Sequence, residues 1–139
     1  MALTADQVRL VTESYALIGR APPPYAELFY HRLLLEHPFA RALFPDEMTH
    51  QIFIFEKTID VLVENIGDLA AMRPTLAALA RQHVGYGVRA HHYAAVGTVL
   101  IDTFAAILGP RFTVQAREAW EAVYAETAGV MIAEAYPQA

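Results

Sequence analysis

The chain has 139 residues, 55% of them hydrophobic and 18% charged, so it can bury a sizeable core and lacks the composition of a disordered chain. Ten Lys and Arg against fifteen Asp and Glu give a net charge of −5, which argues against a nucleic-acid partner or an anionic membrane surface. The absence of Cys excludes disulfides, thiolate metal sites, Cys nucleophiles and sulfur-linked cofactors. Any metal must therefore be held by His or carboxylate ligands.

The length matches that of one domain, and we expect a single domain over residues 1–139. The longest apolar stretch, residues 93–101, is about half of the ~18 residues that a membrane span requires. The first residues of the chain also lack the basic and then apolar layout of a signal peptide. These features predict a cytoplasmic protein that does not enter a membrane.

The first half of the chain predicts two helices and a short helical turn. Thr4 and Gln7 have the spacing of a capping box, and apolar residues then recur at helical spacing. Three consecutive prolines follow, and they break the first helix and begin the next. The expected segments are 4–19, 24–36 and 38–44.

The second half predicts four more helices. Residues 49–65 are strongly periodic, with Gln51 and Phe55 on the apolar face. A weaker helix over 74–84 places His83 on its inward face, and two glycines after it predict a flexible corner. The last two helices are expected over 90–108 and 113–135. Since no segment alternates with period two, the fold class is all-α with six or seven helices, and periodicity alone leaves their arrangement open.

Three polar side chains on three helices are expected to face the interior: Tyr30, Gln51 and His83. Taken alone, His83 fits a core histidine whose ring nitrogens bond to the backbone or to a neighbour. An unpaired buried Tyr or Gln costs about 1–3 kcal/mol, so the three together indicate a polar network or a ligand between them. One inward His with two inward donors, in an otherwise apolar helical protein, is the pattern of a buried haem site.

Other constellations that carry chemistry are missing from the sequence. There is no G-x-S-x-G elbow, glycine-rich phosphate loop, H-E-x-x-H motif or EF-hand run. The remaining histidines lie at helix ends or on polar faces, and each is expected at the surface. They are His31, His37, His50, His91 and His92.

An ordered set of short motifs resembles bacterial single-domain globins, and especially the haem-binding domain of flavohaemoglobins. The motifs span almost the whole chain, and their order and spacing carry the resemblance. They comprise residues 28–33, 36–38, 43–44, 65–69, 79–83, 86–88, 92–97 and 119–124, together with Gln51 and Pro74. The resemblance implies a globin fold packed around a buried haem b.

The resemblance also implies a role for individual residues. His83 matches the iron ligand, and Tyr30 and Gln51 match the distal pair that stabilises bound gas. Tyr93 matches a proximal tyrosine that, with a glutamate from the last helix, bonds to the ligand histidine. The residues implied to bind the cofactor are Phe29, Tyr30, Phe44, Gln51, Phe55, Leu79, His83, Val88, Tyr93 and Val96.

The sequence departs from the family pattern at two places. The proximal glutamate position falls on Ala135, and Glu134 is one residue early, a rotation of about 100° on a helix. The chain ends at Ala139, without the flavin- and NAD-binding reductase of a flavohaemoglobin. We therefore expect any nitric oxide dioxygenase activity to need an external reductase.

These features predict a haem protein that binds O2 reversibly at a pentacoordinate iron, and that also binds NO and CO. Its roles would be oxygen transport or nitric oxide detoxification. Two alternatives stay open: a gas sensor that acts through a partner protein, and a haem-free helical interaction module. Phe53 and Ile54 lie towards the polar side of their helix, and a monomer or a weak homodimer is expected.

Overall fold

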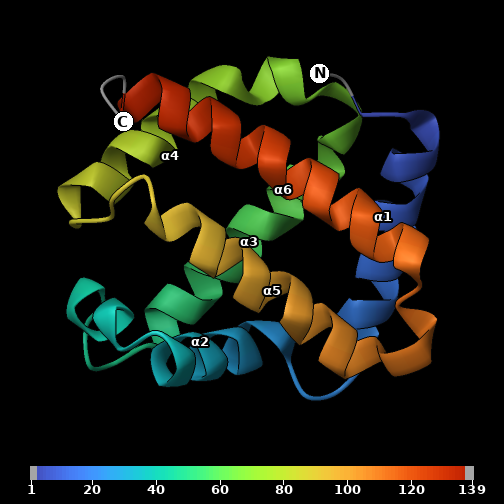
Figure 1. Cartoon of the computed structure of the whole chain (residues 1–139), viewed down its shortest axis with the longest axis horizontal. Coiled ribbons are helices and arrows are strands. Elements are labelled where there is room, and N and C mark those ends of the chain that lie inside the picture. Colours follow the sequence, from blue (N-terminus) through green and yellow to red (C-terminus); the bar gives the residue numbers. More distant parts are fainter. Residues whose placement is uncertain (1–2, 137–139) are drawn as a thin grey trace.

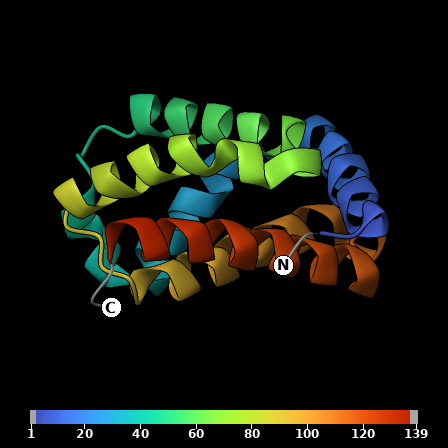
Figure 2. The same ribbon diagram turned by 90° about the horizontal axis from the view of Figure 1, so that it is seen from above.

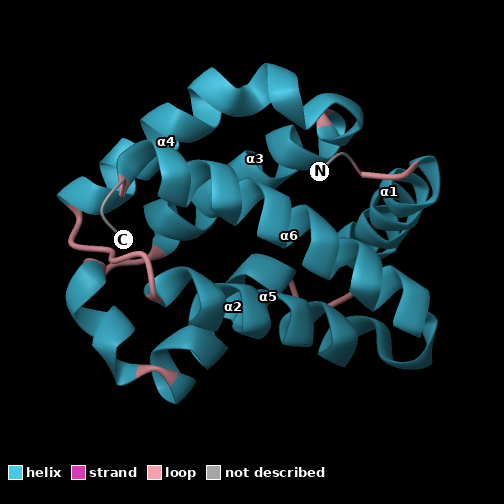
Figure 3. Cartoon of the chain, turned by 45° about the horizontal axis from the view of Figure 1, so that its top comes forward, coloured by secondary structure: helices cyan, strands magenta, loops and turns pink. Residues whose placement is uncertain are grey.

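A computed structural model describes residues 3–136 and confirms the all-helical fold class. The described residues form α-helices, 3₁₀ segments and short loops, with no strand among them (Figure 3). The α-helices are α1 (Ala5–Arg20), α2 (Tyr25–Glu36), α3 (Thr49–Glu64), α4 (Arg73–Gly85), α5 (His92–Leu108) and α6 (Val114–Ala135). The 3₁₀ segments are η1 (Pro38–Leu43), η2 (Ile66–Met72) and η3 (Gly109–Arg111).

Local sequence signals set the starts of α1 and α6. At the start of α1 the backbone N–H of Gln7 donates to Thr4 Oγ1 over 3.1 Å, and the N–H of Thr4 donates to Gln7 Oε1 over 2.9 Å. This reciprocal pair is the predicted capping box, and it satisfies two backbone donors that helix formation leaves free. Thr113 caps α6 in a similar way, accepting from the N–H of Ala116.

Two boundaries differ by more than one residue from those expected. The helix expected from residue 90 begins at His92, because the loop before it makes turns of its own. The chain after α3 does not simply stop at Gly67 but continues as η2, which contains a kink at Asp68. The Asp68 carboxylate accepts from the N–H of Ala71 there, so a side chain replaces a missing backbone acceptor.

The helices lie in two layers (Figures 1 and 2). Seen from above, α3 and α4 lie on one side of the molecule and α5 with α6 on the other, while α1 closes one end. α4 and α1 both pack against α6, and α2 packs against α5. Segments far apart in sequence thereby face one another across a shared interior.

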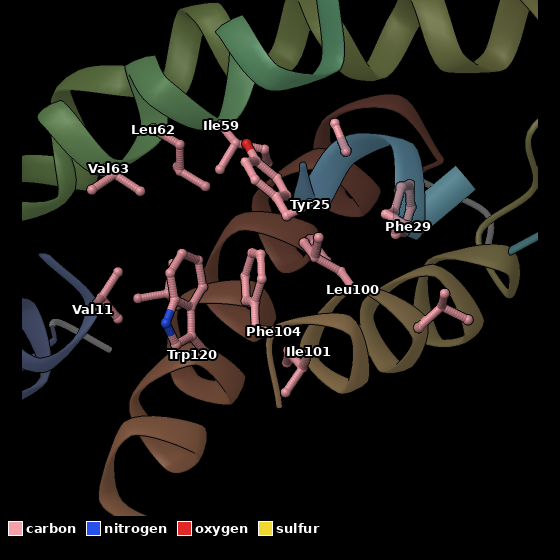
Figure 4. Packing of buried hydrophobic residues seen from close by; sticks show 14 of the residues in the cluster. Val11, Tyr25, Phe29, Ile59, Leu62, Val63, Leu100, Ile101, Phe104 and Trp120 are labelled. Carbon is pink, nitrogen blue, oxygen red and sulfur yellow. The ribbon is translucent and has the colours of Figure 1, made fainter. Parts of the chain in front are cut away.

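α5 is the central helix of this core. Residues 92–111 satisfy the length and composition of a membrane span, with a mean hydropathy of 1.5, but core helices pass the same test. The buried side chains of α5 include Leu100 and Phe104, which pack with Tyr25 and Trp120 in the core (Figure 4). The helix therefore serves as packing surface for its neighbours.

α5 and α6 approach each other closely at Gly97. A Cβ built on Gly97 would lie 2.6 Å from Cδ2 of the Tyr124 ring, well inside van der Waals contact. The Tyr124 hydroxyl donates to the backbone carbonyl of Tyr93 over 2.6 Å, which holds this ring against α5. Gly97 is thus required by packing between two helices.

Candidate functional site

A cavity of about 730 Å³, called the main cavity below, lies between α2, η1, α3, α4, α5 and α6. Every residue that the sequence implied as cofactor-binding lies on its wall. They are Phe29, Tyr30, Phe44, Gln51, Phe55, Leu79, His83, Val88, Tyr93 and Val96. The fold brings these residues together from across the chain, and their part in cofactor binding stays a prediction.

Tyr30 from α2 and Gln51 from α3 form a hydrogen-bonded pair on the cavity wall. Gln51 Nε2 donates to Tyr30 Oη over 3.1 Å. Because the phenol oxygen accepts this bond, the hydroxyl hydrogen of Tyr30 stays free to donate to another group. Gln51 Nε2 keeps a second hydrogen as well, so the pair can offer two donors to one ligand in the main cavity.

A cage of aromatic rings fixes Tyr30 in this position. Its ring makes edge contacts with Phe29, Phe44 and Phe55 at centroid distances of 4.9, 5.3 and 5.4 Å. Phe29 and Phe55 stack on one another with an interplanar angle of 5°. Such contacts add to the free energy gained by burial and leave the Tyr30 ring little freedom to rotate.

Burial also sets the protonation state of Tyr30. Removal of its side chain from water raises the pKa of the phenol to about 12, against a smaller opposing effect of the hydrogen bond from Gln51. The phenol therefore keeps its proton at neutral pH. Tyr30 acts as a hydrogen-bond donor and not as an anion.

His83 lies near the end of α4 with one ring nitrogen already engaged. Its Nδ1 lies 2.7 Å from the carbonyl oxygen of Leu79, one turn earlier in the same helix. A carbonyl can only accept, so Nδ1 carries the hydrogen and Nε2 carries the free lone pair. His83 is thus held in the tautomer that can ligate a metal through Nε2.

The corner after His83 folds the chain back onto the main cavity. Gly87 has φ +94°, a backbone conformation that favours glycine, and Val88 N–H returns to the carbonyl of His83 over 3.0 Å. Val88 is placed on the cavity wall as a result. Of the two glycines that predicted a corner, Gly87 is the one that this backbone requires.

The expected hydrogen bond between Tyr93 and His83 is not formed. The two rings lie 6.0 Å apart, and the Nδ1 hydrogen of His83 goes to Leu79 because that carbonyl is a nearer, intrahelical acceptor. The buried Tyr93 hydroxyl has no hydrogen-bond partner in the described part of the chain. Burial raises the pKa of Tyr93, so this phenol stays neutral, and its ring makes an edge contact with Tyr136 at a centroid distance of 5.9 Å.

Glu134 does not complete a proximal network either. Its carboxylate forms an ion pair with Arg73, which joins α6 to the start of α4. Since the side chains of both residues keep substantial contact with solvent, this pair links two helices at the surface. The rotation of about 100° expected between positions 134 and 135 agrees with this outward placement.

The structure adds residues to the site that the sequence did not indicate. His92 lines the main cavity and stacks on Phe39 at a centroid distance of 4.3 Å, while its side chain stays partly exposed, as expected of a histidine near the surface. Desolvation, aided by His91 and Arg89, lowers the pKa of His92. A histidine next to a charged loop gives no sequence signal for such a stack.

α6 contributes cavity residues that the sequence also missed. Trp120, Tyr124, Thr127 and Met131 all line the main cavity. Apolar side chains spread around most of this helix, so no inward face stands out from its periodicity. The Thr127 hydroxyl is buried without a hydrogen-bond partner among residues 3–136.

No group of three or more His, Asp or Glu side chains in the described residues could hold a metal ion by itself. The wall of the main cavity is mainly apolar, and His83 offers its only assigned free imidazole lone pair. His83 is therefore placed to ligate a metal carried by a larger organic group that fills this apolar space.

Comparison with known proteins gives consistent results. Residues 27–131 match the family model described as Globin. The chain is 29% identical to a flavohemoprotein of Vibrio cholerae over 136 residues, which is 94% of this chain and 34% of that protein. It is 33% identical to a flavohemoprotein of Bordetella parapertussis over 107 residues, 75% of this chain and 27% of the relative. The chain thus spans about a third of the length of these relatives.

Two solved structures share the fold at lower identity. An engineered carbene transferase from Rhodothermus marinus, whose parent is named as a candidate nitric oxide dioxygenase, aligns with a TM-score of 0.83 and 24% identity. This alignment covers 96% of this chain and 94% of the other. A bacterial globin from Campylobacter jejuni aligns with a TM-score of 0.83 and 23% identity, over 96% and 97% of the two chains. The chain therefore belongs to the globin family, and this membership implies a haem cofactor.

Proposed function

We propose that the protein binds haem b in the main cavity through His83 and uses it to bind O2 reversibly. The single observation that carries the proposal is the tautomer of His83: Nδ1 donates to Leu79, which leaves the Nε2 lone pair for a metal. The cavity volume of about 730 Å³ falls within the ~300–1,000 Å³ of typical cofactor pockets. The residues present therefore fit the group that the family implies.

Bound haem supplies an iron atom that forms a reversible bond to a diatomic gas. Tyr30 and Gln51 supply hydrogen-bond donors for a gas ligand that becomes partly negative. Each such bond to a charged acceptor contributes about 1.5–3 kcal/mol, and a water-poor surrounding strengthens it. The hydrogen bond between Tyr30 and Gln51 holds both donors ready before a ligand enters.

The aromatic cage supports selective and reversible binding. Phe29, Phe44 and Phe55 surround the Tyr30 ring with apolar surface, which strengthens a hydrogen bond from its hydroxyl to a ligand. The Leu79 carbonyl fixes the plane of the His83 ring, which sets the orientation of the metal ligand. O2, NO and CO are the diatomic ligands that suit such a site.

Visible spectroscopy of the haem-loaded, reduced protein tests the proposal. Admission of O2 should shift the absorption bands, and removal of O2 should restore the original spectrum. A Tyr30→Phe variant should bind haem equally well and release O2 faster. Absence of a Soret band after haem addition would refute the proposal and leave the haem-free interaction module.

A second function, the conversion of NO to nitrate, draws support from the comparisons. The curated relatives are flavohemoproteins about three times as long as this chain, and one structural neighbour derives from a candidate nitric oxide dioxygenase. We propose that this chain performs that reaction only when a separate reductase restores the reduced iron. NO consumption by the oxygenated protein should then become catalytic on addition of a flavin reductase with NADH.

A further inference from the structure

A row of hydrogen-bonded side chains joins α1, α2 and α3 outside the main cavity. Tyr15 Oη donates to Asp60 Oδ1 over 2.5 Å, and the hydroxyl oxygens of Tyr15 and Tyr25 lie 2.7 Å apart. Because the hydrogen of Tyr15 goes to Asp60, Tyr25 must be the donor in the second bond. Tyr15 therefore gives its hydrogen to a carboxylate while its oxygen accepts one from a neighbouring phenol.

Tyr15 can be reached from solvent. Together with Asp60 it lines a second hollow of about 450 Å³, whose other walls come from α1, α3 and η2. Val8 and Val63 give this hollow an apolar side, and Thr12 and Glu64 give it a polar one. Its size and mixed lining suit a small aromatic molecule that carries a hydroxyl group.

On its inner side Tyr15 adjoins Trp120. The ring centroids lie 6.0 Å apart, and Trp120 is 2% exposed and also lines the main cavity. The indole Nε1 donates to Ser14 Oγ over 2.8 Å, which fixes the ring beside α1. Figure 4 shows the Trp120 ring with its nitrogen on the side of α1 and Phe104 on the other side. Two aromatic rings thus connect the main cavity with the second hollow.

The hydrogen bonds of Tyr15 suit a group that loses an electron. Burial, the hydrogen bond to Asp60 and the contact with Tyr25 raise the pKa of Tyr15, so the phenol is neutral at rest. Oxidation of a phenol makes its hydrogen strongly acidic, and the Asp60 carboxylate lies in position to receive it. The bond from Tyr25 would then stabilise the oxygen of the resulting phenoxyl radical.

We propose that Tyr15 is a site of one-electron oxidation, linked to the main cavity through Trp120 and to a proton acceptor at Asp60, which oxidises small phenolic reductants bound in the second hollow. The inference rests on the proposed function, because the oxidising equivalent arises from hydrogen peroxide at the haem. Tyr15 is the group that touches the reductant. Trp120 and Asp60 are positioning residues that carry the electron and the proton.

Each cycle takes one electron and one proton from the phenolic reductant. Tyr15 gives one electron through Trp120 to the main cavity and its hydroxyl proton to Asp60, and becomes a neutral phenoxyl. A phenolic reductant returns one hydrogen atom to Tyr15 and leaves as its own phenoxyl, and Asp60 releases its proton to solvent. Two such cycles supply the two electrons and two protons that reduce one hydrogen peroxide to two water molecules.

Spin trapping on the haem-loaded protein locates the radical. After addition of hydrogen peroxide and a nitroso spin trap, peptide mass spectrometry should find the adduct on Tyr15, and Tyr15→Phe should lose it. Tyr86 serves as the internal comparison, because it is 67% exposed and, like Trp120, lines the main cavity. If solvent exposure alone determines which tyrosine is oxidised, the adduct forms on Tyr86 and not on Tyr15, and the proposal is overturned.

A second measurement distinguishes electron and proton transfer through Trp120 and Asp60, called the relay below, from a purely structural role of these residues. Protein loaded with zinc protoporphyrin is flashed in the presence of a one-electron quencher, which leaves an oxidised porphyrin in the main cavity. Decay of the oxidised porphyrin should coincide with the rise of phenoxyl absorption, and Trp120→Phe should slow both. Asp60→Asn keeps an acceptor oxygen for Tyr15 but binds a proton poorly, so it should slow phenoxyl formation without altering the fold.

The two proposals fail in different ways. Lack of porphyrin or haem absorption in the purified complex would refute the proposed function before any flash or peroxide is applied. Normal absorption with equal phenoxyl kinetics in the wild type, Trp120→Phe and Asp60→Asn proteins would refute the relay alone. Circular dichroism of each variant establishes that the helices are retained.

Discussion

At the scale of single residues, the proposed preference for a gas ligand that becomes negative rests on the hydrogens of Tyr30 and Gln51. Gln51 donates to the Tyr30 oxygen, so each partner points at least one free N–H or O–H away from the other. The aromatic neighbours of Tyr30 keep the phenol neutral and dry, with its pKa raised to about 12. We therefore expect this pair to stabilise a ligand that gains negative charge more than one that does not.

Replacement of Tyr30 by Phe removes the O–H donor but keeps the ring contacts. The lost bond to a charged acceptor amounts to about 1.5–3 kcal/mol, so O2 dissociation should accelerate roughly tenfold or more. Stopped-flow release of O2 measures this rate, and CO serves as the control ligand because it acquires less charge. An equal acceleration for O2 and CO would show that the ring, and not the hydroxyl, controls release.

His92 is expected to make the folded protein less stable in acid. Its pKa is lowered, first by desolvation and then by His91 and Arg89, from a usual value of 6.5. Below pH 6.5 the unfolded chain therefore binds more protons at this position than the folded one, and stability falls as the pH falls through that region. His92→Gln should show a smaller decrease in melting temperature than wild type on acidification below 6.5. Equal decreases in the melting temperature of both proteins would contradict this effect of His92.

At the scale of elements, the separation of α5 and α6 is set where Gly97 meets the ring of Tyr124. The ring carbons Cδ2 and Cζ lie 2.6 and 2.8 Å from the place of a Gly97 Cβ, so no larger residue fits without movement. The same ring is tied to α5 by its hydrogen bond to the Tyr93 carbonyl. Both helices line the main cavity, so a shift at this contact also changes the shape of the site.

Gly97→Ala should therefore destabilise the protein. Overpacking costs about 1–3 kcal/mol, and displacement of Tyr124 would also break its bond to the Tyr93 carbonyl. Gly129→Ala is the matched control in α6, since nothing lies within 4 Å of its added Cβ. In the control the higher helix propensity of Ala should raise the free energy of unfolding by about 1 kcal/mol. Chemical denaturation of both variants should thus give changes of opposite sign, and two changes of the same sign would contradict the packing argument.

The helix boundaries could be predicted because their signals are local. Thr4 and Gln7, a few residues apart, form the capping box that starts α1, and Thr113 caps α6. Prolines and glycines likewise mark the breaks between helices. The inward face of α6 could not be predicted, because its apolar residues lie on several sides and only contact with α1, α4 and α5 selects among them.

At the scale of the whole molecule, the core and the main cavity account for the high proportion of apolar residues. A chain that is 55% hydrophobic packs one continuous core and also lines a cavity of about 730 Å³. An apolar cavity of this size leaves its wall without contact partners until a ligand fills it. Binding of haem to the folded chain alone should therefore stabilise the fold as a whole.

This linkage predicts a concentration-dependent melting temperature. The stabilisation follows RT ln(1 + [L]/Kd), which is about 2.7 kcal/mol at a haem concentration one hundred times Kd. Differential scanning fluorimetry at increasing haem concentrations should show a steady rise for wild type. A melting temperature that does not respond to haem would show that the cavity is not its binding site.

The composition of the site could be predicted better than its hydrogen bonds. Tyr30, Gln51 and His83 were indicated by their inward positions on separate helices, and the fold gathers them at one cavity. The partners of His83 and Glu134 could not be predicted, because they depend on distances of a few ångströms within α4 and between α4 and α6. His83 bonds within its own helix and Glu134 pairs with Arg73, choices that side-chain spacing along the chain does not determine.

Haem titration of wild type, His83→Ala and His91→Ala shows whether His83 is the iron ligand. His91 is an exposed histidine at the start of α5 and provides the control for loss of an imidazole. Wild type and His91→Ala should each bind one haem per chain with a sharp Soret band, and His83→Ala should lose that band and bind haem weakly. A His83→Ala protein with the band and affinity of wild type would contradict the assignment of His83 as the iron ligand.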